Sequence, residues 1–456
     1  MGFAWRTVRP CCRHSVSRQV APGGSWRSAR LAWTLSAHPA PIKYTLGLWQ
    51  GAALYVGVVI GTGILVLPAI AAETAGPASV LAWFALVLLS FPLALTYAAL
   101  SRDRPDAAGF AGAIERAFGP RGGAAAGWIF LAQAPTGYVI AALIAGEYAA
   151  SLIGGGREAR FVLGGGLVAL AYVLNAAGLR ISARAQLLSV GAIAAGMILI
   201  VGRTLSHVDR SAFLPFAPHG AAAVGLAALQ LFWAFVGWEA ITPLAVDFRN
   251  PRDISRASLL AVVVVGILYV SLAIATIGTR AYGRALGSET PLVPMAASTF
   301  GPAAAIVVGI AGFVLSFAPV NAYTAGISRL ICALGRRRQL PVWLGVESAS
   351  GTPLRALGVM GTLCAAAASL AYAAGWNIAD LLPLSTSSFI ATYVLSMAAA
   401  MRLLRPPLRY AAAVSLAACV GVLFFAGAML VWIAGVAACS VAYQWLVTRR
   451  AGTVVN

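Results

Sequence analysis

Apolar runs of about 20 residues recur almost without pause after residue 45, and each is long enough to cross about 30 Å of hydrocarbon as a helix. Of the 456 residues, 60% are hydrophobic and only 10% are charged, with a mean hydropathy of +0.86. A soluble domain does not need so much apolar surface, so the sequence predicts an all-α integral membrane fold with about twelve transmembrane helices. We place the spans at residues 46–74, 77–100, 123–152, 161–178, 185–202, 222–246, 257–279, 298–325, 356–374, 378–401, 410–426 and 428–447.

The basic residues behind the net charge of +19 are distributed unevenly between the predicted loops. With the N-terminus inside, 26 of the 32 basic residues fall in cytoplasmic segments and six in external loops. This asymmetry is the positive-inside rule, so we expect both termini in the cytoplasm and no nucleic-acid partner. Residues 1–45 contain seven basic residues and no acid, and we expect a disordered cytoplasmic tail there; residues 448–456 form the cytoplasmic C-terminus.

Two spans are interrupted by residues that weaken a helix. The first contains "GVVIGTGILVLP" (57–68), and the sixth contains "LQLFWAFVGWEAITPLAVDF", in which the acid Glu239 closely follows Gly237. These spans are five apart, an odd number, so a second five-span unit would enter the membrane from the opposite side. Interrupted segments at matching positions of inverted halves indicate a transporter binding site. We therefore divide the chain into five-helix repeats at 46–203 and 222–402, followed by two additional helices at 409–447.

The two breaks would offer groups of opposite polarity to a ligand. The N–H groups at the start of "GTGIL" and the positive end of that half-helix suit a carboxylate. Gly63 permits close approach to the backbone, and Thr62 adds a hydroxyl. Glycine can also serve only helix packing, which is the alternative interpretation. Carbonyl groups that suit an ammonium would be freed at Val59, Ile60, Trp233 and Val236. Together the breaks predict a site for the α-carbon end of an amino acid.

Five motifs, in order along the chain, resemble signatures of the amino acid–polyamine–organocation (APC) superfamily of transporters. They are "GTGILVLP" (61–68), "FWAFVGWEA" (232–240), "DFRNPRDISRAS" (247–258), "GISRLICALGRRRQLP" (326–341) and "GTPLRAL" (351–357). The chain looks closest to the bacterial branch that exports methionine and neutral, branched-chain amino acids. The resemblance covers residues 46 to 405. It implies a LeuT-like 5+5 inverted repeat with two additional C-terminal helices, in the plasma (bacterial inner) membrane.

The resemblance also implies roles for individual residues. Thr62 and Gly63 would hold the substrate carboxylate, and Trp233 or Phe235 would close over the substrate side chain. Glu239 stands where relatives keep an acid and is the proton-coupling candidate; capping of the broken helix is its structural alternative. The full set of candidate substrate-binding residues is Val59, Ile60, Gly61, Thr62, Gly63, Trp233, Phe235, Val236 and Gly237.

The coupling ion does not follow from these residues. The fifth span has no lysine of the kind that replaces sodium in some relatives. Ser316 and Thr324 lie eight residues apart on the eighth span, about 12 Å along a helix, which is too far to share one sodium ion. Proton linkage through Glu239 and simple exchange both stay open.

Five further features lie outside the two breaks. Gln133 and Thr136 in the third span could line the pathway or form hydrogen bonds between helices. Glu147 is expected at the outer interface, reaching water in a structural role. Asp380 suits the N-terminus of the tenth span. Residues 110–118, "FAGAIERAF", predict a short amphipathic helix on the cytoplasmic side.

Together the residues and the resemblance predict a secondary active transporter of neutral apolar amino acids (leucine, isoleucine, valine or methionine) that works by alternating access. The resemblance implies export, but the residues do not set the direction of transport. The expected partners are the amino acid and the lipid bilayer. Import or exchange of other amino acids, transport of cationic amino acids or polyamines, and a non-transporting membrane sensor are the alternatives. No enzyme, cofactor or metal site is predicted, because the four histidines lie in the tail or in the loop after the fifth span and no two carboxylates share a span.

Overall fold

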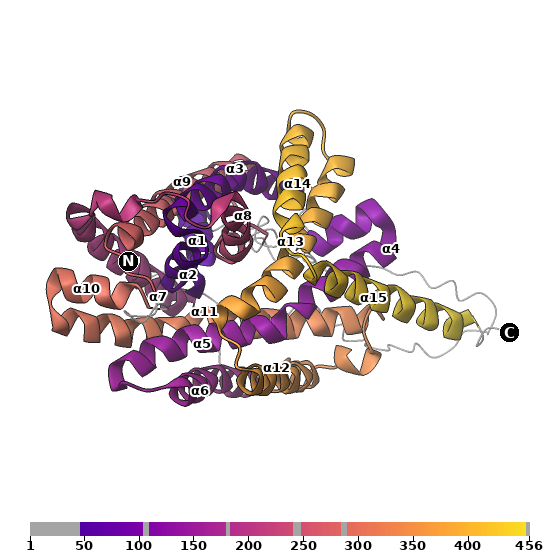
Figure 1. Cartoon of the computed structure of the whole chain (residues 1–456). Helices are drawn as coiled ribbons and strands as arrows, with labels where there is room; N and C mark the ends of the chain where they lie inside the picture. The colour runs from indigo at the N-terminus through magenta and orange to yellow at the C-terminus, as the bar shows by residue number, and fades with distance from the viewer. Residues whose placement is uncertain (1–45, 104–108, 179–182, 240–247, 284–289, 453–456) are drawn as a thin grey trace, which may run out of the picture.

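The computed structural model describes residues 46–103, 109–178, 183–239, 248–283 and 290–452 (Figure 1). The tail expected at 1–45 and the part of the sixth span after Glu239 lie outside these residues. The described chain is built of helices, and its β structure is a single isolated bridge between Leu46 and Phe248. The prediction of an all-α fold is confirmed.

Most predicted spans contain a helix, but the eighth, at 298–325, is misplaced: its first residues lie in a separate helix, Leu292–Phe300, and the helix after it runs from Pro302 to Arg336. The first half contains α1 (Leu48–Val59), η1 (Thr62–Leu65), α2 (Leu67–Ala75), η2 (Gly76–Ala78), α3 (Ser79–Asp103), α4 (Gly109–Ala132), α5 (Ala134–Ile153), α6 (Arg157–Ala176) and α7 (Ala183–Thr204). The rest contains η3 (Leu205–His207), η4 (Arg210–Phe213), α8 (Gly220–Leu231), η5 (Phe232–Phe235), α9 (Pro251–Gly278), α10 (Leu292–Phe300), α11 (Pro302–Arg336), η8 (Val342–Gly345), α12 (Leu354–Ala374), α13 (Ile378–Leu403), α14 (Leu408–Phe424) and α15 (Met429–Gly452).

Eight helical stretches among the described residues are long and apolar enough to cross a membrane. Four shorter apolar helices accompany them, at Leu48–Val59, Gly191–His207, Gly220–Phe235 and Leu408–Phe424. Two of these four are short because they end at the interruptions of the first and sixth predicted spans. The exact count of twelve and the inverted five-helix repeat stay predictions.

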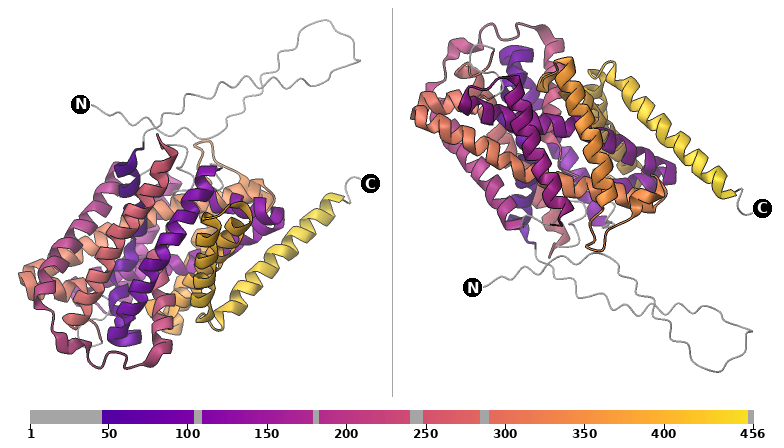
Figure 2. Two further views of the ribbon diagram at one scale, coloured as in Figure 1. Left: turned by 90° about the horizontal axis from the view of Figure 1, so that it is seen from above. Right: turned by 90° about the horizontal axis from the view of Figure 1, so that it is seen from below.

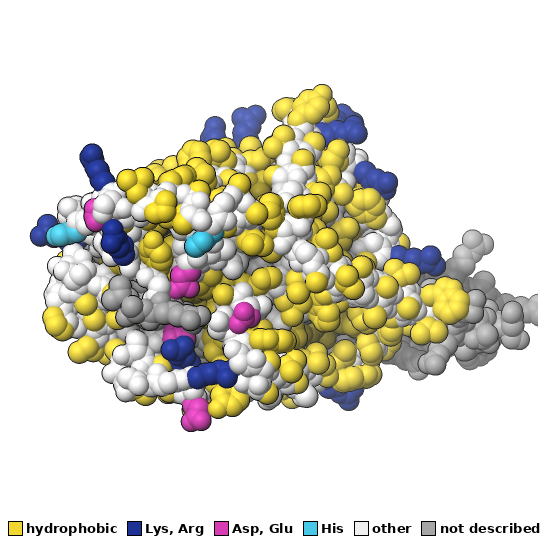
Figure 3. All heavy atoms as spheres, in the orientation of Figure 1, with side chains coloured by type: hydrophobic (Ala, Val, Ile, Leu, Met, Phe, Trp, Pro, Cys, Tyr) yellow, Lys and Arg dark blue, Asp and Glu magenta, His cyan; other side chains and the backbone are white. Residues whose placement is uncertain are grey.

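The outer surface of the helix bundle is apolar. Figure 3 shows hydrophobic side chains over much of one face, with arginine side chains mostly near its margins. Large exposed side chains occur on many helices, among them Phe84, Val162, Leu188, Ile267, Val307 and Val431. Soluble proteins rarely expose continuous apolar patches of more than a few hundred Å². The surface is therefore suited to lipid and not to water.

The segment between the second and third predicted spans agrees with the sequence. A backbone kink at Gly119, with φ 79°, separates residues 109–118 of α4 from the rest of that helix, and Pro120 follows it. The short helix expected at 110–118 is thus a separate segment. At the C-terminal end of the chain, α15 runs along the edge of the bundle and is mostly exposed (Figure 2).

The most deeply buried large side chains gather around the two interrupted spans. They come from both sides of each break and from the helices that pack against them. The largest fully buried ones are Trp83, Trp238, Tyr55, Tyr97, Tyr148, Tyr269, Tyr393, Phe232, Phe235, Ile60, Ile64 and Leu67. Aromatic side chains bury much surface and pair edge to face, so the breaks lie in the best-packed part of the molecule.

The orientation can be tested with single cysteines. Ala217, before α8, and Ala349, before α12, are both exposed, and the charge asymmetry places them on opposite sides. In a background without Cys11, Cys12 and Cys439, we expect a membrane-impermeant maleimide to label Ala217→Cys on whole cells and Ala349→Cys only after lysis. The reverse pattern would overturn the topology.

Candidate functional site

The first predicted span is interrupted as the sequence indicates. Helix α1 ends at Val59, and the capping residue Ile60 leaves the helical region with ψ 75°. Gly61 is extended, with φ −86° and ψ −169°, and η1 then makes one 3₁₀ turn before α2 begins at Leu67, where Pro68 occupies a first-turn position. Proline is tolerated there because first-turn N–H groups have no helical partner. The backbone between the two half-helices is therefore available for other contacts.

The sixth predicted span is interrupted in a similar way. Helix α8 continues into the 3₁₀ segment η5, after which Val236 is extended (φ −80°, ψ 144°). Gly237 has φ 128°, a conformation that side-chain-bearing residues rarely adopt, so glycine is required at this break. Trp238 and Glu239 form a turn directly after it.

A cavity of about 120 Å³ lies between the two breaks. Its wall is mostly apolar, with the hydroxyls of Thr62, Tyr138 and Tyr323 as polar groups, and none of the described residues that line it is charged. The lining residues are Val58, Val59, Gly61, Thr62, Gly63, Gly137, Tyr138, Ala141, Trp233, Ala234, Val236, Pro319, Val320, Tyr323 and Phe389. Mostly apolar cavities with a few polar groups are typical of small-molecule sites.

The structure brings six of the nine predicted binding residues to this cavity: Val59, Gly61, Thr62, Gly63, Trp233 and Val236. The other three lie outside its lining. Ile60 is fully buried in the core, and Gly237 lies at the break with its N–H directed to Glu239. Phe235 packs against Trp83 and Tyr269, with ring centroids 5.8 and 5.3 Å away. Of the two aromatic residues expected to close over the substrate, only Trp233 is therefore placed to do so.

Trp233 rests on two glycines. A Cβ atom at Gly63 would lie 2.5 Å from Cδ1 of the indole, and one at Gly137 would lie 3.1 Å from its Cη2. The ring also meets Phe389 edge to face, with centroids 5.7 Å apart. The close approach that the sequence predicts at Gly63 is therefore occupied by the Trp233 side chain. Any larger residue there would push the indole toward the cavity.

The sequence predicts a free carbonyl at Val59, and the structure shows that this prediction is wrong. The carbonyl accepts a hydrogen bond from the N–H of Gly61 at 2.7 Å and another from the hydroxyl of Tyr269 at 2.9 Å. A carbonyl oxygen has two lone pairs, so both are in use. The reason is physical: a buried backbone group that loses its helical partner is satisfied by a side chain where one is in reach.

Glu239 lies beside the second break and not in the cavity lining. Its side chain is 7% exposed, and Oε2 accepts hydrogen bonds from the N–H of Gly237, at 3.0 Å, and from the hydroxyl of Tyr393 on α13. The carboxylate thus holds the unwound backbone, which is the structural alternative left open by the sequence. A proton-coupling role stays a prediction.

Sequence reasoning missed the walls of the cavity contributed by other helices. Gly137, Tyr138 and Ala141 come from α5, Pro319, Val320 and Tyr323 from α11, and Phe389 from α13. The nearest sequence signal was the pair of polar residues Gln133 and Thr136, which lie just before Gly137.

Those two residues form hydrogen bonds and do not line the cavity. Gln133 is fully buried; its Nε2 lies 3.5 Å from the Tyr323 hydroxyl, and Ser385 donates to its Oε1 at 3.4 Å. The Thr136 hydroxyl donates to the Gln133 carbonyl at 3.0 Å. Gln133 therefore links α5, α11 and α13 behind the cavity wall, as the helix–helix alternative expects.

The other polar residues singled out in the sequence analysis have structural partners. Ser316 and Thr324 donate to carbonyls of their own helix, at 2.6 and 2.9 Å, and no group of three potential metal ligands occurs among the described residues. Asp380 completes a capping box with Asn377, as expected for a helix N-terminus. Glu147 is structural too, but it does not reach water as predicted: it is buried and pairs with Arg160 at 2.6 Å.

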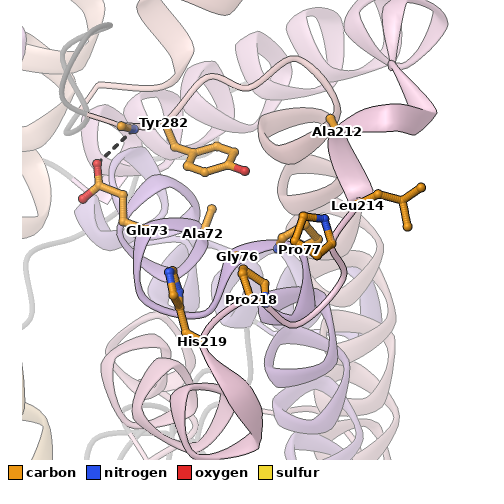
Figure 4. A pocket seen from close by; sticks show the side chains of 11 residues that line it. Ala72, Glu73, Gly76, Pro77, Ala212, Leu214, Pro218, His219 and Tyr282 are labelled. Atoms are coloured by element: carbon orange, nitrogen blue, oxygen red, sulfur yellow. Dashed lines mark hydrogen bonds between the residues drawn. The ribbon is translucent and has the colours of Figure 1, made fainter.

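A second, larger hollow of about 430 Å³ lies on the predicted outer side (Figure 4). The end of α2, the loop before α8 and the loop after α9 form it, and none of the residues of the two breaks lines it. The carboxylate of Glu73 accepts a hydrogen bond from the N–H of Gly283 at 3.0 Å, and Nδ1 of His219 lies 3.0 Å from the Thr74 carbonyl. These contacts join the outer half of the first span to two loops. The smaller cavity at the breaks is the candidate site.

Comparison with known proteins places these features in a family. The model of a family described as amino acid permease matches residues 46–449. The chain is 36% identical over 361 residues to the uncharacterized amino acid permease YecA of Bacillus subtilis (strain 168), covering 78% of this chain and 84% of the relative. It is 32% identical over 419 residues to the L-methionine/branched-chain amino acid exporter YjeH of Escherichia coli (strain K12), covering 91% and 98%. It is 24% identical over 355 residues to the branched-chain amino acid permease BcaP of Bacillus subtilis (strain 168), covering 72% and 75%.

The close contact between the Trp233 indole and Gly63 predicts that adding one methyl group at Gly63 weakens substrate binding. Overpacking of this kind costs about 1–3 kcal/mol, so we expect Gly63→Ala to raise the half-saturating substrate concentration about ten- to hundredfold. The measurement is transport of the amino acid that the wild-type protein carries fastest. Gly358→Ala on α12 is the matched control, because a Cβ there meets nothing within 4 Å and the position is exposed. Equal values for the two variants would show that Trp233 is not held against Gly63.

Proposed function

We propose a substrate class and a mechanism for this chain, which belongs to the amino acid permease family. It carries neutral apolar amino acids across the membrane by alternating access. One observation supports the substrate class most directly: the cavity between the two broken spans is small, apolar and without a charged wall. A binding cavity for a cationic side chain would need a carboxylate to replace the water that the cation loses.

The size of the cavity suits an aliphatic side chain. Its volume is about 120 Å³, and an apolar cavity of about 150 Å³ is known to bind benzene. Val58, Ala141 and Val320 would contact the aliphatic side chain of the substrate, and the indole ring of Trp233 would cover it. Leucine, isoleucine, valine and methionine have side chains of this size and polarity.

The polar end of the substrate would meet the backbone of the breaks. We propose that Thr62 and the N–H groups of η1 hold the carboxylate, since the N-terminal end of a helical segment attracts an anion. The ammonium would be held by the carbonyls of Trp233 and Val236, and by that of Val59 when the Tyr269 hydroxyl leaves it. Backbone groups distinguish an amino acid from other small molecules without selecting its side chain.

Export is the direction that we propose. Over 91% of this chain, the sequence is related to a protein named as an exporter of methionine and branched-chain amino acids. The site itself imposes no direction, because alternating access is reversible and the gradients decide. We place the protein in the plasma membrane with both termini in the cytoplasm, as the arginine distribution predicts.

Flux in proteoliposomes tests the substrate class. We expect labelled leucine, isoleucine, valine and methionine to be transported at least about tenfold faster than arginine, lysine or putrescine, since an uncompensated buried charge costs several kcal/mol. Arginine or putrescine flux without leucine flux would show that the cationic alternative is correct. No flux with any of these compounds, in protein that remains folded, would favour the sensor alternative.

Glu239 supplies a separate prediction about coupling. Glutamine has nearly the same size and hydrogen-bonding capacity but cannot titrate, so Glu239→Gln should keep leucine binding and flatten the pH dependence of flux between about pH 5.5 and 8. A proton would act here as a ligand that shifts the populations of two conformations. If Glu239 serves only to hold Gly237, the variant should lose stability and keep the wild-type pH profile. A flat wild-type profile over this range would exclude the proton role.

A further inference from the structure

We propose that Tyr269 is a positioning residue that links the two broken spans and competes with the substrate for the carbonyl of Val59. Tyr269 lies in the middle of α9 and is fully buried. Its hydroxyl is 2.9 Å from the carbonyl oxygen of Val59 and 3.2 Å from that of Ala234. One side chain thus contacts both interruptions, although its own helix has none.

The two acceptors are backbone groups at the points where the half-helices end. Val59 is the last residue of α1, and Ala234 lies in η5, two residues before the extended Val236. Carbonyls at a helix end have no partner inside the helix, so they need one from elsewhere when they are buried. A phenol has a single proton, which it can share between two acceptors or give fully to one. Tyr269 therefore satisfies both breaks only while they stay in their present relative positions.

The ring of Tyr269 is held firmly. It packs edge to face against Trp83 of α3, with centroids 5.3 Å apart, and against Phe235 of η5, also 5.3 Å away. Trp83 and Phe235 are themselves 5.8 Å apart, so the three rings form one closed cluster. The hydroxyl cannot follow one break if that break moves alone. Either the two spans move together, or the hydroxyl leaves one of the carbonyls.

A bound amino acid changes which carbonyl the hydroxyl can use. The Val59 oxygen already accepts from Gly61 and from Tyr269, so an ammonium can reach a lone pair of Val59 only when the hydroxyl turns to Ala234. Substrate binding would then be coupled to a shift of the hydroxyl from the first break to the second. This part of the inference depends on the proposed transport function.

Replacing Tyr269 by phenylalanine tests both proposed roles of its hydroxyl, the link between the breaks and the competition for the Val59 carbonyl. Tyr269→Phe keeps the aromatic cluster and removes only the hydroxyl. We expect KM for leucine to fall about three- to tenfold, because the competitor for Val59 is gone, and kcat to fall at least about tenfold, because the breaks are no longer linked. A purely structural hydroxyl predicts the opposite pattern: less folded protein, with unchanged KM per folded molecule.

Tyr97→Phe is the matched control. Tyr97 is also fully buried in an aromatic cluster, but its hydroxyl lies beside Ser396 of α13 and contacts neither break. We expect KM and kcat of this variant within about twofold of the wild-type values, since no hydrogen bond to either break is lost. Unchanged KM and kcat in Tyr269→Phe as well would overturn the proposal.

A second measurement needs no substrate. Val58 lines the cavity and is 37% exposed, so Val58→Cys, in the background without Cys11, Cys12 and Cys439, reports on the opening of the first break. We expect Tyr269→Phe to change the maleimide labelling rate of this cysteine at least about threefold, and Tyr97→Phe to leave it unchanged. Equal rates in all backgrounds would overturn the link between the spans. A changed rate in a protein that transports none of the tested amino acids would support the link while rejecting the proposed substrates.

Discussion

The need to satisfy backbone hydrogen bonds away from water governs this structure. A membrane helix satisfies its own N–H and C=O groups, so a break in its middle is tolerated only where other protein groups replace the lost partners or where the break lines a cavity. Both solutions occur here. Tyr269 and Glu239 supply side-chain partners at the two breaks, and the remaining backbone faces a cavity of about 120 Å³. Many of the fully buried aromatic side chains among the described residues surround the same two places.

The sequence was sufficient for features that depend on neighbouring residues. The apolar runs predicted the helices, and glycine, threonine and proline between Gly61 and Pro68 predicted the first break, because each weakens a helix locally. Gly237 marked the second break for the same reason, and the structure gives it the positive φ that only glycine adopts readily. Six of the nine predicted binding residues line the cavity because they belong to these two segments.

The rest of the site depends on tertiary contacts that local patterns do not show. Trp233 and Phe235 lie two residues apart in a 3₁₀ segment, which has three residues per turn, so they point in different directions and the sequence does not show which of them faces the cavity. Membrane helices are apolar on all sides, and periodicity therefore does not reveal that Gly137 and Phe389 face the cavity. The partner of the Val59 carbonyl is Tyr269, 210 positions away in the chain. Such pairings require the packed arrangement of α1, α8 and α9.

The position of Glu239 limits how a proton could act. The carboxylate does not line the cavity, so it would not contact the substrate directly. Its bonds to the N–H of Gly237 and to the hydroxyl of Tyr393 connect the second break to α13. Neutralising the acid would weaken the hold on Gly237, because a hydrogen bond to a charged acceptor is about twice as strong as a neutral one. The released segment is continuous with Ala234, whose carbonyl accepts from Tyr269. A proton at the second break and an amino acid at the first would therefore affect the same hydroxyl, which is a physical route for coupling the two ligands.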